Sequence, residues 1–158
     1  INTLGLGLGF CVQETNVREG HWSGGGQEWS YISHERPSNG GGTGFLVRRG
    51  LHCEPLKHKW RRCGIGLEYC WIRVRADGGW VYLCSLYLPP QQTARVADVQ
   101  ALSDTIDQFL GQSETVGCLV MGDFNSPLAD CDLLASLGYG GVSVSYVRRG
   151  ERWKRRLG

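Results

Sequence analysis

The sequence predicts one α/β domain, in which two sheets or one large mixed sheet are covered by helices. Three observations carry this prediction. Several apolar runs of strand length come before and after residues 93–110, with glycine-rich turns between them. Residues 93–110 repeat their apolar side chains with the period of a helix. The length of 158 residues corresponds to a single domain, 1–158, with a two-layer core.

The first half of the chain contains three predicted strands. The run from Phe10 to Thr15 begins with apolar residues and then reaches Gln13 and Glu14. Shorter strands are predicted at residues 29–32 and 44–47, between glycine-rich segments. The 24 glycines therefore indicate turns rather than disorder, because apolar runs lie between them.

A β-hairpin is predicted in the middle of the chain. Apolar runs at Glu68–Arg75 and Trp80–Leu88 are joined by Asp77-Gly78-Gly79, a composition typical of hairpin turns. Pro89 and Pro90 end the second strand, because proline cannot donate a hydrogen bond to a sheet.

A helix is predicted to follow, with Thr93 as N-cap and Gly111 after its last residue. One face of this helix is apolar. Its members are Val96, Val99, Leu102, Ile106, Phe109 and Leu110.

The run Cys118–Asn125 is predicted to be the central strand, buried on both faces along its first four residues. Gly122 frees the backbone from side-chain clashes. Asp123 and Asn125 then follow two residues apart, so in an extended segment their side chains point the same way. An Asp/Asn turn that caps the next helix is the alternative. That helix is predicted at residues 130–137, and a last strand at 142–147.

Charge and cysteine content limit the functional classes. The net charge of +2 is too small to indicate nucleic-acid binding by itself, although six basic residues lie in the last eleven positions. The seven cysteines are odd in number and form no Cys-x-x-Cys pair, so we expect free thiols in a reducing intracellular environment. No run has transmembrane length. Because the chain does not start with Met, we expect a piece of a longer polypeptide.

A zinc site is the alternative use of the histidines and cysteines in the middle of the chain. The candidates are His52, Cys53, His58, Cys63 and Cys70. Their spacing matches no common structural-zinc pattern, and Cys70 belongs to a strand. We therefore expect these residues to be dispersed, with several thiols in the core. His21 and His34, like His52 and His58, are expected on the surface or in loops.

Four motifs in order resemble the endonuclease/exonuclease/phosphatase superfamily, the metal-dependent phosphodiesterases that include exonuclease III-like abasic-site nucleases. They are Val12–Thr15, Gly40–Val47, Ser85–Pro90 and Met121–Asn125. Within the superfamily they look most like the endonuclease domains of non-LTR retrotransposons. The resemblance extends from about Phe10 to Tyr146.

The resemblance implies a four-layer α/β sandwich of the DNase I/AP-endonuclease-like type and a DNA endonuclease that nicks one strand. Glu14 matches the metal-binding glutamate, for Mg²⁺ or Mn²⁺. Asp123 matches the aspartate that positions or deprotonates the attacking water. Asn125 matches the asparagine that holds the scissile phosphate, and Tyr87 the tyrosine that contacts it. The resemblance implies DNA as a partner and a larger polypeptide that contains a reverse transcriptase. We expect the protein to be intracellular, in the nucleus, and not to associate with a membrane.

The sequence also departs from the family pattern at both ends. It lacks the early strand with a metal-proximal asparagine and the final Ser-Asp-His-type strand, so the implied fold is incomplete at both termini. We therefore expect slow nicking and marginal stability. A second hypothesis is a catalytically dead remnant that binds nucleic acid through Arg48, Arg49 and the basic tail. A phosphatase acting on lipids or inositol phosphates is a third.

Overall fold

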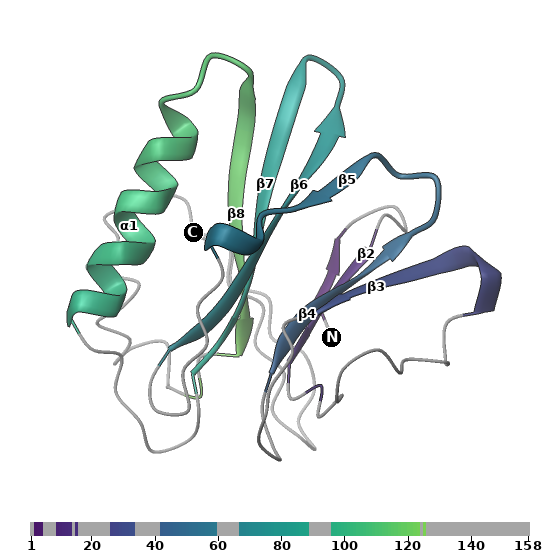
Figure 1. Ribbon diagram of the computed structural model, residues 1–158, viewed down its shortest axis with the longest axis horizontal. Coiled ribbons are helices and arrows are strands. Elements are labelled where there is room, and N and C mark those ends of the chain that lie inside the picture. Colours follow the sequence, from purple (N-terminus) through teal and green to yellow (C-terminus); the bar gives the residue numbers. More distant parts are fainter. Residues whose placement is uncertain are drawn as a thin grey trace, which may run out of the picture.

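The computed structural model describes residues 2–4, 9–13, 15, 26–33, 42–59, 67–88, 96–123 and 125. These residues form a mixed α/β fold with two sheets and one α-helix (Figure 1). Glu14, the Pro89-Pro90 pair, Thr93 and the elements predicted at 130–137 and 142–147 lie outside the described residues.

The first sheet, sheet A, is antiparallel and has the strand order β1-β2-β4-β3. Its strands are β1 (Asn2–Leu4), β2 (Gly9–Gln13), β3 (Trp29–Ser33) and β4 (Thr43–Arg48). A short 3₁₀ helix, η1 (Gly26–Glu28), leads into β3. The strands predicted at 10–15, 29–32 and 44–47 are thus confirmed within one or two residues at most ends, apart from Glu14, which lies outside the described residues.

The second sheet, sheet B, has the order β5-β6-β7-β8. It contains β5 (Cys53–Pro55), β6 (Glu68–Ala76), β7 (Gly79–Tyr87) and β8 (Thr115–Asp123), and a second 3₁₀ helix, η2 (Lys57–Lys59), follows β5. The predicted hairpin is confirmed as the β6–β7 pair, with Asp77 and Gly78 in the turn. β7 and β8 are parallel, and their connection contains the helix α1 (Val96–Leu110).

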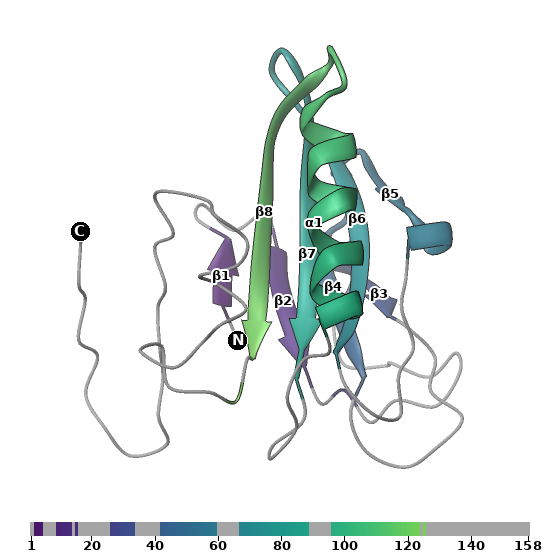
Figure 2. The same ribbon diagram turned by 90° about the vertical axis from the view of Figure 1, so that its left-hand side faces the viewer.

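The elements form three layers in the order α1, sheet B, sheet A (Figures 1 and 2). One core cluster lies between α1 and sheet B, where Leu102, Ile106 and Phe109 are buried. The Phe109 ring stacks on Tyr82, with ring centroids 4.0 Å apart, and meets Trp71 edge-on at 5.1 Å. The predicted apolar face of the helix is therefore confirmed at these positions, whereas Leu110, at the last turn, is 47 % exposed.

A second core cluster fills the space between the two sheets. Cys11 and Phe45 come from sheet A, and Cys70, Ile72 and Leu83 come from sheet B. Side chains alternate along a strand, so each strand of the β6–β7 pair supplies one set of residues to α1 and the other set to sheet A. This explains why both strands read as nearly continuous apolar runs.

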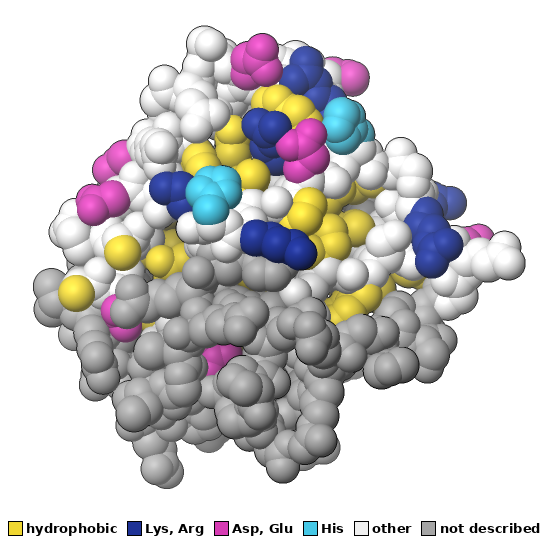
Figure 3. All heavy atoms as spheres, viewed as in Figure 1, with side chains coloured by type: hydrophobic (Ala, Val, Ile, Leu, Met, Phe, Trp, Pro, Cys, Tyr) yellow, Lys and Arg dark blue, Asp and Glu magenta, His cyan; other side chains and the backbone are white. Residues whose placement is uncertain are grey.

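Charged side chains lie over the part of sheet B around Trp80. The Arg73 guanidinium lies 4.1 Å from the Trp80 ring centroid, and that of Arg75 lies at 5.2 Å. Arg73 Nε donates to Glu54 Oε2 at 2.8 Å, and this hydrogen bond is the main reason why the pKa of Glu54 is lowered. Figure 3 shows basic, histidine and acidic side chains around hydrophobic surface on this face. The arginines thus cover the outer side of an indole that belongs to the core cluster between α1 and sheet B.

The prediction that Cys118–Asn125 is a strand buried on both faces is wrong in its burial. Among the described residues, β8 pairs only with β7 and is an edge strand. None of its side chains is fully buried, and Val116 and Leu119 are 55 % and 43 % exposed. An apolar run specifies a strand, but it does not specify how many neighbours that strand has. In the part of the chain that the structure describes, no helix is both long and apolar enough to cross a bilayer.

Candidate functional site

Two of the strand ends that were predicted to carry chemistry, those of β7 and β8, meet at one end of sheet B. Glu68 pairs with Tyr87 across the antiparallel β6–β7 ladder, and Tyr87 pairs with Asp123 across the parallel β7–β8 ladder. Directly paired residues share a face of a sheet, so these three side chains form one row. The row continues the face that carries Cys70 and Ser85, and this face is turned toward sheet A.

The members of the row differ in exposure. Glu68 and Tyr87 are each 4 % exposed, whereas Asp123 is exposed at the open end of β8. Tyr87 and Asp123 were predicted from the sequence, but Glu68 was not, because a glutamate at the start of an apolar strand looks like an ordinary strand boundary. Its position 19 residues before Tyr87, across a hairpin with a short turn, is the signal that would have indicated the pairing.

Asn125 does not extend β8 as predicted. Its φ is +45°, in the left-handed region, and its backbone N–H donates to Asp123 Oδ1 at 2.9 Å. The backbone therefore turns after Asp123, which corresponds to the Asp/Asn turn that was the alternative. Asn125 Nδ2 also donates to the Leu88 carbonyl oxygen at 2.7 Å, so the side chain joins the ends of β7 and β8. Only one of the two amide hydrogens is used in this bond.

Gly122 is required by the closeness of β7. A Cβ atom at this position would lie 1.8 Å from the Leu86 carbonyl oxygen, which is backbone and cannot move aside. The glycine lets β8 stay paired with β7 up to Asp123, where the Leu88 N–H donates to the Asp123 carbonyl at 2.9 Å. The predicted role of Gly122 as a position without side-chain clashes is consistent with this packing.

A polar cluster centred on Ser85 links sheet A to sheet B. Ser85 is the neighbour of Tyr87 on the same face of β7. Ser85 is fully buried, and its Oγ accepts from Cys11 Sγ at 3.0 Å and from Gln13 Nε2 at 3.3 Å. The same hydroxyl donates to the Val12 carbonyl oxygen at 3.3 Å. The last residues of β2 are therefore held against β7. Gln13, the residue before Glu14, faces the inter-sheet space near the row.

A second tie links the start of β4 to the row itself. The Gly42 N–H donates to Glu68 Oε2 at 3.2 Å, and Gly42 lies against Thr15. Gly42 and Thr43 are buried, and Thr43 pairs with Gln13 in sheet A. The end of β2 and the start of β4 thus reach the same end of the inter-sheet space as Tyr87 and Asp123.

The structure brings together three of the four predicted site residues. Tyr87, Asp123 and Asn125 lie at adjoining strand ends, while Glu14 lies outside the described residues. The residues on either side of Glu14 are both at this end of the molecule: Gln13 contacts Ser85, and Thr15 lies next to Gly42. The roles of the four residues remain predictions.

The donor set of this site suits a hard divalent cation. The exposed Asp123 presents carboxylate oxygens, and Gln13 and Asn125 present amide oxygens, whereas Glu68 Oε2 accepts the Gly42 N–H. Mg²⁺ prefers oxygen ligands and typically uses one or two carboxylates together with water and phosphate oxygens. No group of three or more His, Cys, Asp or Glu side chains placed to hold a metal occurs among the described residues. A site of the Mg²⁺ type does not require such a group.

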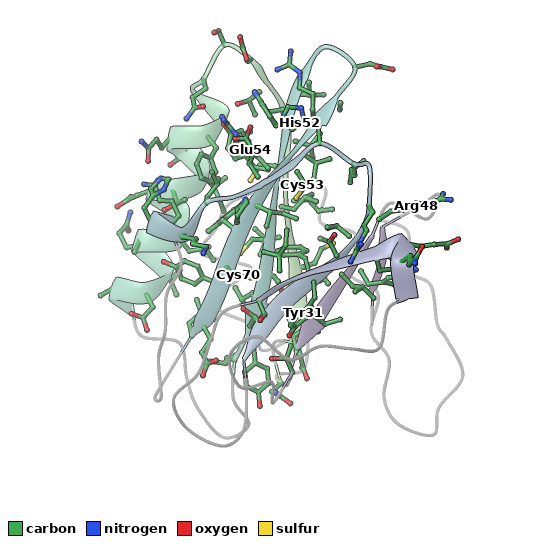
Figure 4. The ribbon with its side chains drawn as sticks, turned by 45° about the vertical axis from the view of Figure 1, so that its right-hand side comes forward. Tyr31, Arg48, His52, Cys53, Glu54 and Cys70 are labelled. Atoms are coloured by element: carbon green, nitrogen blue, oxygen red, sulfur yellow. The ribbon has the colours of Figure 1, made fainter. Side chains whose placement is uncertain are left out.

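The residues of the alternative zinc site take separate positions. His52 lies on the exposed edge strand region beside Glu54, with 3.3 Å between His52 Nε2 and Glu54 Oε1, and its ring packs edge-on against Trp80 (Figure 4). Cys53 is half-buried against the inter-sheet core, and Cys70 is fully buried within it. His58 is exposed in η2, and Cys63 lies outside the described residues. The prediction that Cys70 belongs to a strand is confirmed, and its thiol lies in the core.

The arginines proposed for nucleic-acid binding lie away from the row. β4 starts at Thr43, next to the site, and runs to Arg48 at its other end. Six extended residues span about 17 Å, so Arg48 does not line the site. Arg49 donates from Nε to the Trp29 carbonyl oxygen at 3.1 Å and belongs to the β3–β4 edge.

Comparison of the sequence with protein-family models gives no match, and comparison with curated proteins also gives none. The function is therefore inferred from the residues of the site and from the sequence motifs that contain them.

Proposed function

We propose that this chain is a divalent-metal-dependent phosphodiesterase of the DNA endonuclease type. The observation that carries the proposal is the row Glu68–Tyr87–Asp123, joined by the Asn125 bridge to Leu88. It places a carboxylate, a phenol and a carboxamide at adjoining strand ends, beside the residues that flank Glu14. These are the groups that hydrolysis of a phosphodiester requires.

Each group has a role that follows from its chemistry. The Asp123 carboxylate is exposed and accepts protons, so it positions the attacking water and takes one of its protons as the new P–O bond forms and the leaving P–O bond breaks. Tyr87 and Asn125 are neutral donors that orient the phosphate. Glu14 is the proposed metal ligand, with the amide oxygen of Gln13 as a further oxygen donor nearby. Bound Mg²⁺ or Mn²⁺ supplies neutralisation of charge on the phosphate.

We also propose that the complete fold is a four-layer α/β sandwich. The order of helix, sheet and sheet supports this, because two sheets packed face to face with a helix outside one of them form three of the four layers. The proposed substrate is DNA, which would approach the row at the exposed Asp123.

The test is a time course of supercoiled plasmid nicking in Mg²⁺. We expect open circles to form with the unsubstituted chain and not in EDTA. Asp123→Ala is expected to lower the rate by about 10²-fold or more, because it removes the general base. Gly117→Ala is the matched control, since a Cβ there meets no atom within 4 Å and Gly117 is remote from the row.

Two outcomes would contradict the proposal. Equal nicking by Asp123→Ala would show that Asp123 has no catalytic role or that the activity belongs to a contaminant. An unsubstituted chain that binds plasmid DNA and leaves it intact would favour the second hypothesis, a catalytically dead domain that binds nucleic acid.

A further inference from the structure

We propose that Glu68 is a positioning residue, which sets the place of the β2 end relative to Tyr87 and Asp123 by holding the Gly42 backbone. This inference rests on the proposed function, because it assigns a role within the same site. Neither the motifs nor the predicted site included Glu68.

Glu68 contacts the backbone of Gly42. Glu68 belongs to sheet B and Gly42 precedes the first residue of β4 in sheet A, so the 3.2 Å hydrogen bond from Gly42 N–H to Glu68 Oε2 crosses between the sheets. Glu68 is 4 % exposed, and Gly42 is also buried. Water competes weakly for a hydrogen bond in such a place, and a carboxylate acceptor makes it stronger than a neutral one.

Gly42 in turn lies against Thr15. Gly42 has φ of +97°, a conformation that favours glycine, and a Cβ atom there would lie 2.6 Å from Thr15 Oγ1. The Gly42 backbone therefore touches the residue that follows Glu14 in the sequence. Glu68 fixes Gly42, and Gly42 limits where Thr15 can lie.

Glu68 is also a member of the row. It pairs with Tyr87, which pairs with Asp123, so the residue that holds the sheet A segment is part of the ladder that presents the proposed catalytic groups. The Ser85 cluster, next to Tyr87 on the same face of β7, fixes β2 through Gln13 and Val12. The two ties thus hold the end of β2 and the start of β4 against sheet B at two successive positions, in addition to the packing of the inter-sheet core.

A positioning role predicts different results for two substitutions of Glu68. Glu68→Gln keeps an oxygen that accepts the Gly42 N–H, whereas Glu68→Ala removes the acceptor. A direct role of the charge, as metal ligand or proton acceptor, would make both variants equally defective. Gly42→Ala tests the same link from the other side, because its Cβ displaces Thr15 while Glu68 is intact.

The experiment combines hydrogen exchange of the Gly42 amide, measured by NMR, with plasmid nicking and Mn²⁺ titration of the same variants. With Glu68→Ala we expect Gly42 to lose its protection and kcat to fall by about 10²-fold with little change in KM, as displacement of a catalytic group by about 1 Å does. With Glu68→Gln we expect Gly42 to stay protected, the pH profile of kcat to keep its shape, and nicking to stay within about threefold of the original. Gly42→Ala should lower kcat as Glu68→Ala does.

Two results would overturn the inference. The first is unchanged Gly42 protection in Glu68→Ala. The second is a Glu68→Gln variant that protects Gly42 yet nicks as slowly, or binds Mn²⁺ as weakly, as Glu68→Ala, since the charge would then act directly. Asp123→Ala should leave Gly42 protected, which separates the two proposals. If the unsubstituted chain does not nick DNA, the proposed function fails, and amide exchange with Mn²⁺ binding still decides the role of Glu68.

Discussion

At the scale of single residues, Asn125 joins backbone geometry to the proposed chemistry. Its left-handed φ of +45° turns the chain out of β8, and its side chain is anchored on the Leu88 carbonyl. Asparagine tolerates this conformation better than most residues with a side chain. The same amide group is proposed to orient the phosphate, so its position is fixed before a substrate arrives.

Two substitutions at Asn125 separate the contribution of its backbone conformation from that of its side chain. Asn125→Ala loses the bond to Leu88 and keeps a Cβ in the left-handed region, so we expect it to lower the free energy of unfolding by about 2 kcal/mol. Asn125→Gly loses the same bond without that strain, and the expected loss is about 1 kcal/mol. Urea denaturation followed by circular dichroism measures both. Equal stability of the two variants would show that the left-handed turn carries no strain.

At the scale of elements, the β7–β8 pair determines where the site lies. Parallel strands bring their carboxyl ends to the same edge, and Tyr87 and Asp123 are direct neighbours there. Two glycines in β8 have opposite surroundings. Gly122 is pressed against the Leu86 backbone, and Gly117 has open space around its Cα.

This difference gives a matched pair of alanine substitutions in one strand. We expect Gly122→Ala to destabilise the domain by about 3 kcal/mol or more, because its Cβ would lie 1.8 Å from the Leu86 oxygen and the ladder must separate. Gly117→Ala should change the free energy of unfolding by at most about 0.5 kcal/mol, or increase it slightly through the entropy of the unfolded chain. Thermal unfolding of both variants is the measurement. Similar losses in the two would mean that β8 does not approach β7 as described.

At the scale of the whole molecule, the core between and around the sheets contains ionisable thiols. Cys11, Cys70 and Cys84 are fully buried. Burial raises the pKa of Cys11 to about 11 and that of Cys70 to about 12, and it raises the pKa of Cys84 well above 9.0. The folded core thus holds these thiols in the neutral form at a pH where an unfolded chain would begin to lose their protons.

This shift makes the stability of the domain depend on alkaline pH. Because the folded pKa values are raised, the stabilisation is complete below the unfolded pKa of 9.0 and is lost as the pH rises through 9 toward 11–12. At pH 10 we expect a loss of about 1 kcal/mol for each buried thiol. Denaturant unfolding at pH 7, 9 and 10 measures it, with Cys70→Ala as control, since this variant should lose less stability between pH 7 and 10. A free energy that is flat up to pH 10 would contradict the description of the core.

Sequence patterns predicted most of the described elements, and the misses have physical causes. The 3.6-residue period identified α1 because Leu102, Ile106 and Phe109 face a single sheet. The composition Asp77-Gly78-Gly79 identified the hairpin because few residues accept that turn. The burial of β8 was mispredicted because hydrophobicity does not report the number of strands that pair with it. Leu110 is exposed because the apolar face is needed only as far as Phe109.

The site was predictable only where a residue belonged to a recognisable motif. Tyr87, Asp123 and Asn125 each follow an apolar run, and the structure brings them together. Glu68 was missed because its relation to Tyr87 depends on the hairpin register, which becomes certain only once the turn is defined. The local conformation of Asn125 was missed because both an extended end and a turn satisfy the same four residues, Gly-Asp-Phe-Asn.

The bridge from Asn125 to Leu88 has a consequence for how this domain can diversify. The chain leaves β7 after Tyr87 and β8 after Asp123, and the hydrogen bond from Asn125 to Leu88 keeps these two exits adjacent. Inserting or exchanging either following segment would alter what approaches the row without touching the ladder beneath it. The two exits are therefore positions at which the following segments can change what reaches the proposed reaction centre, while the strand ladder beneath it stays the same.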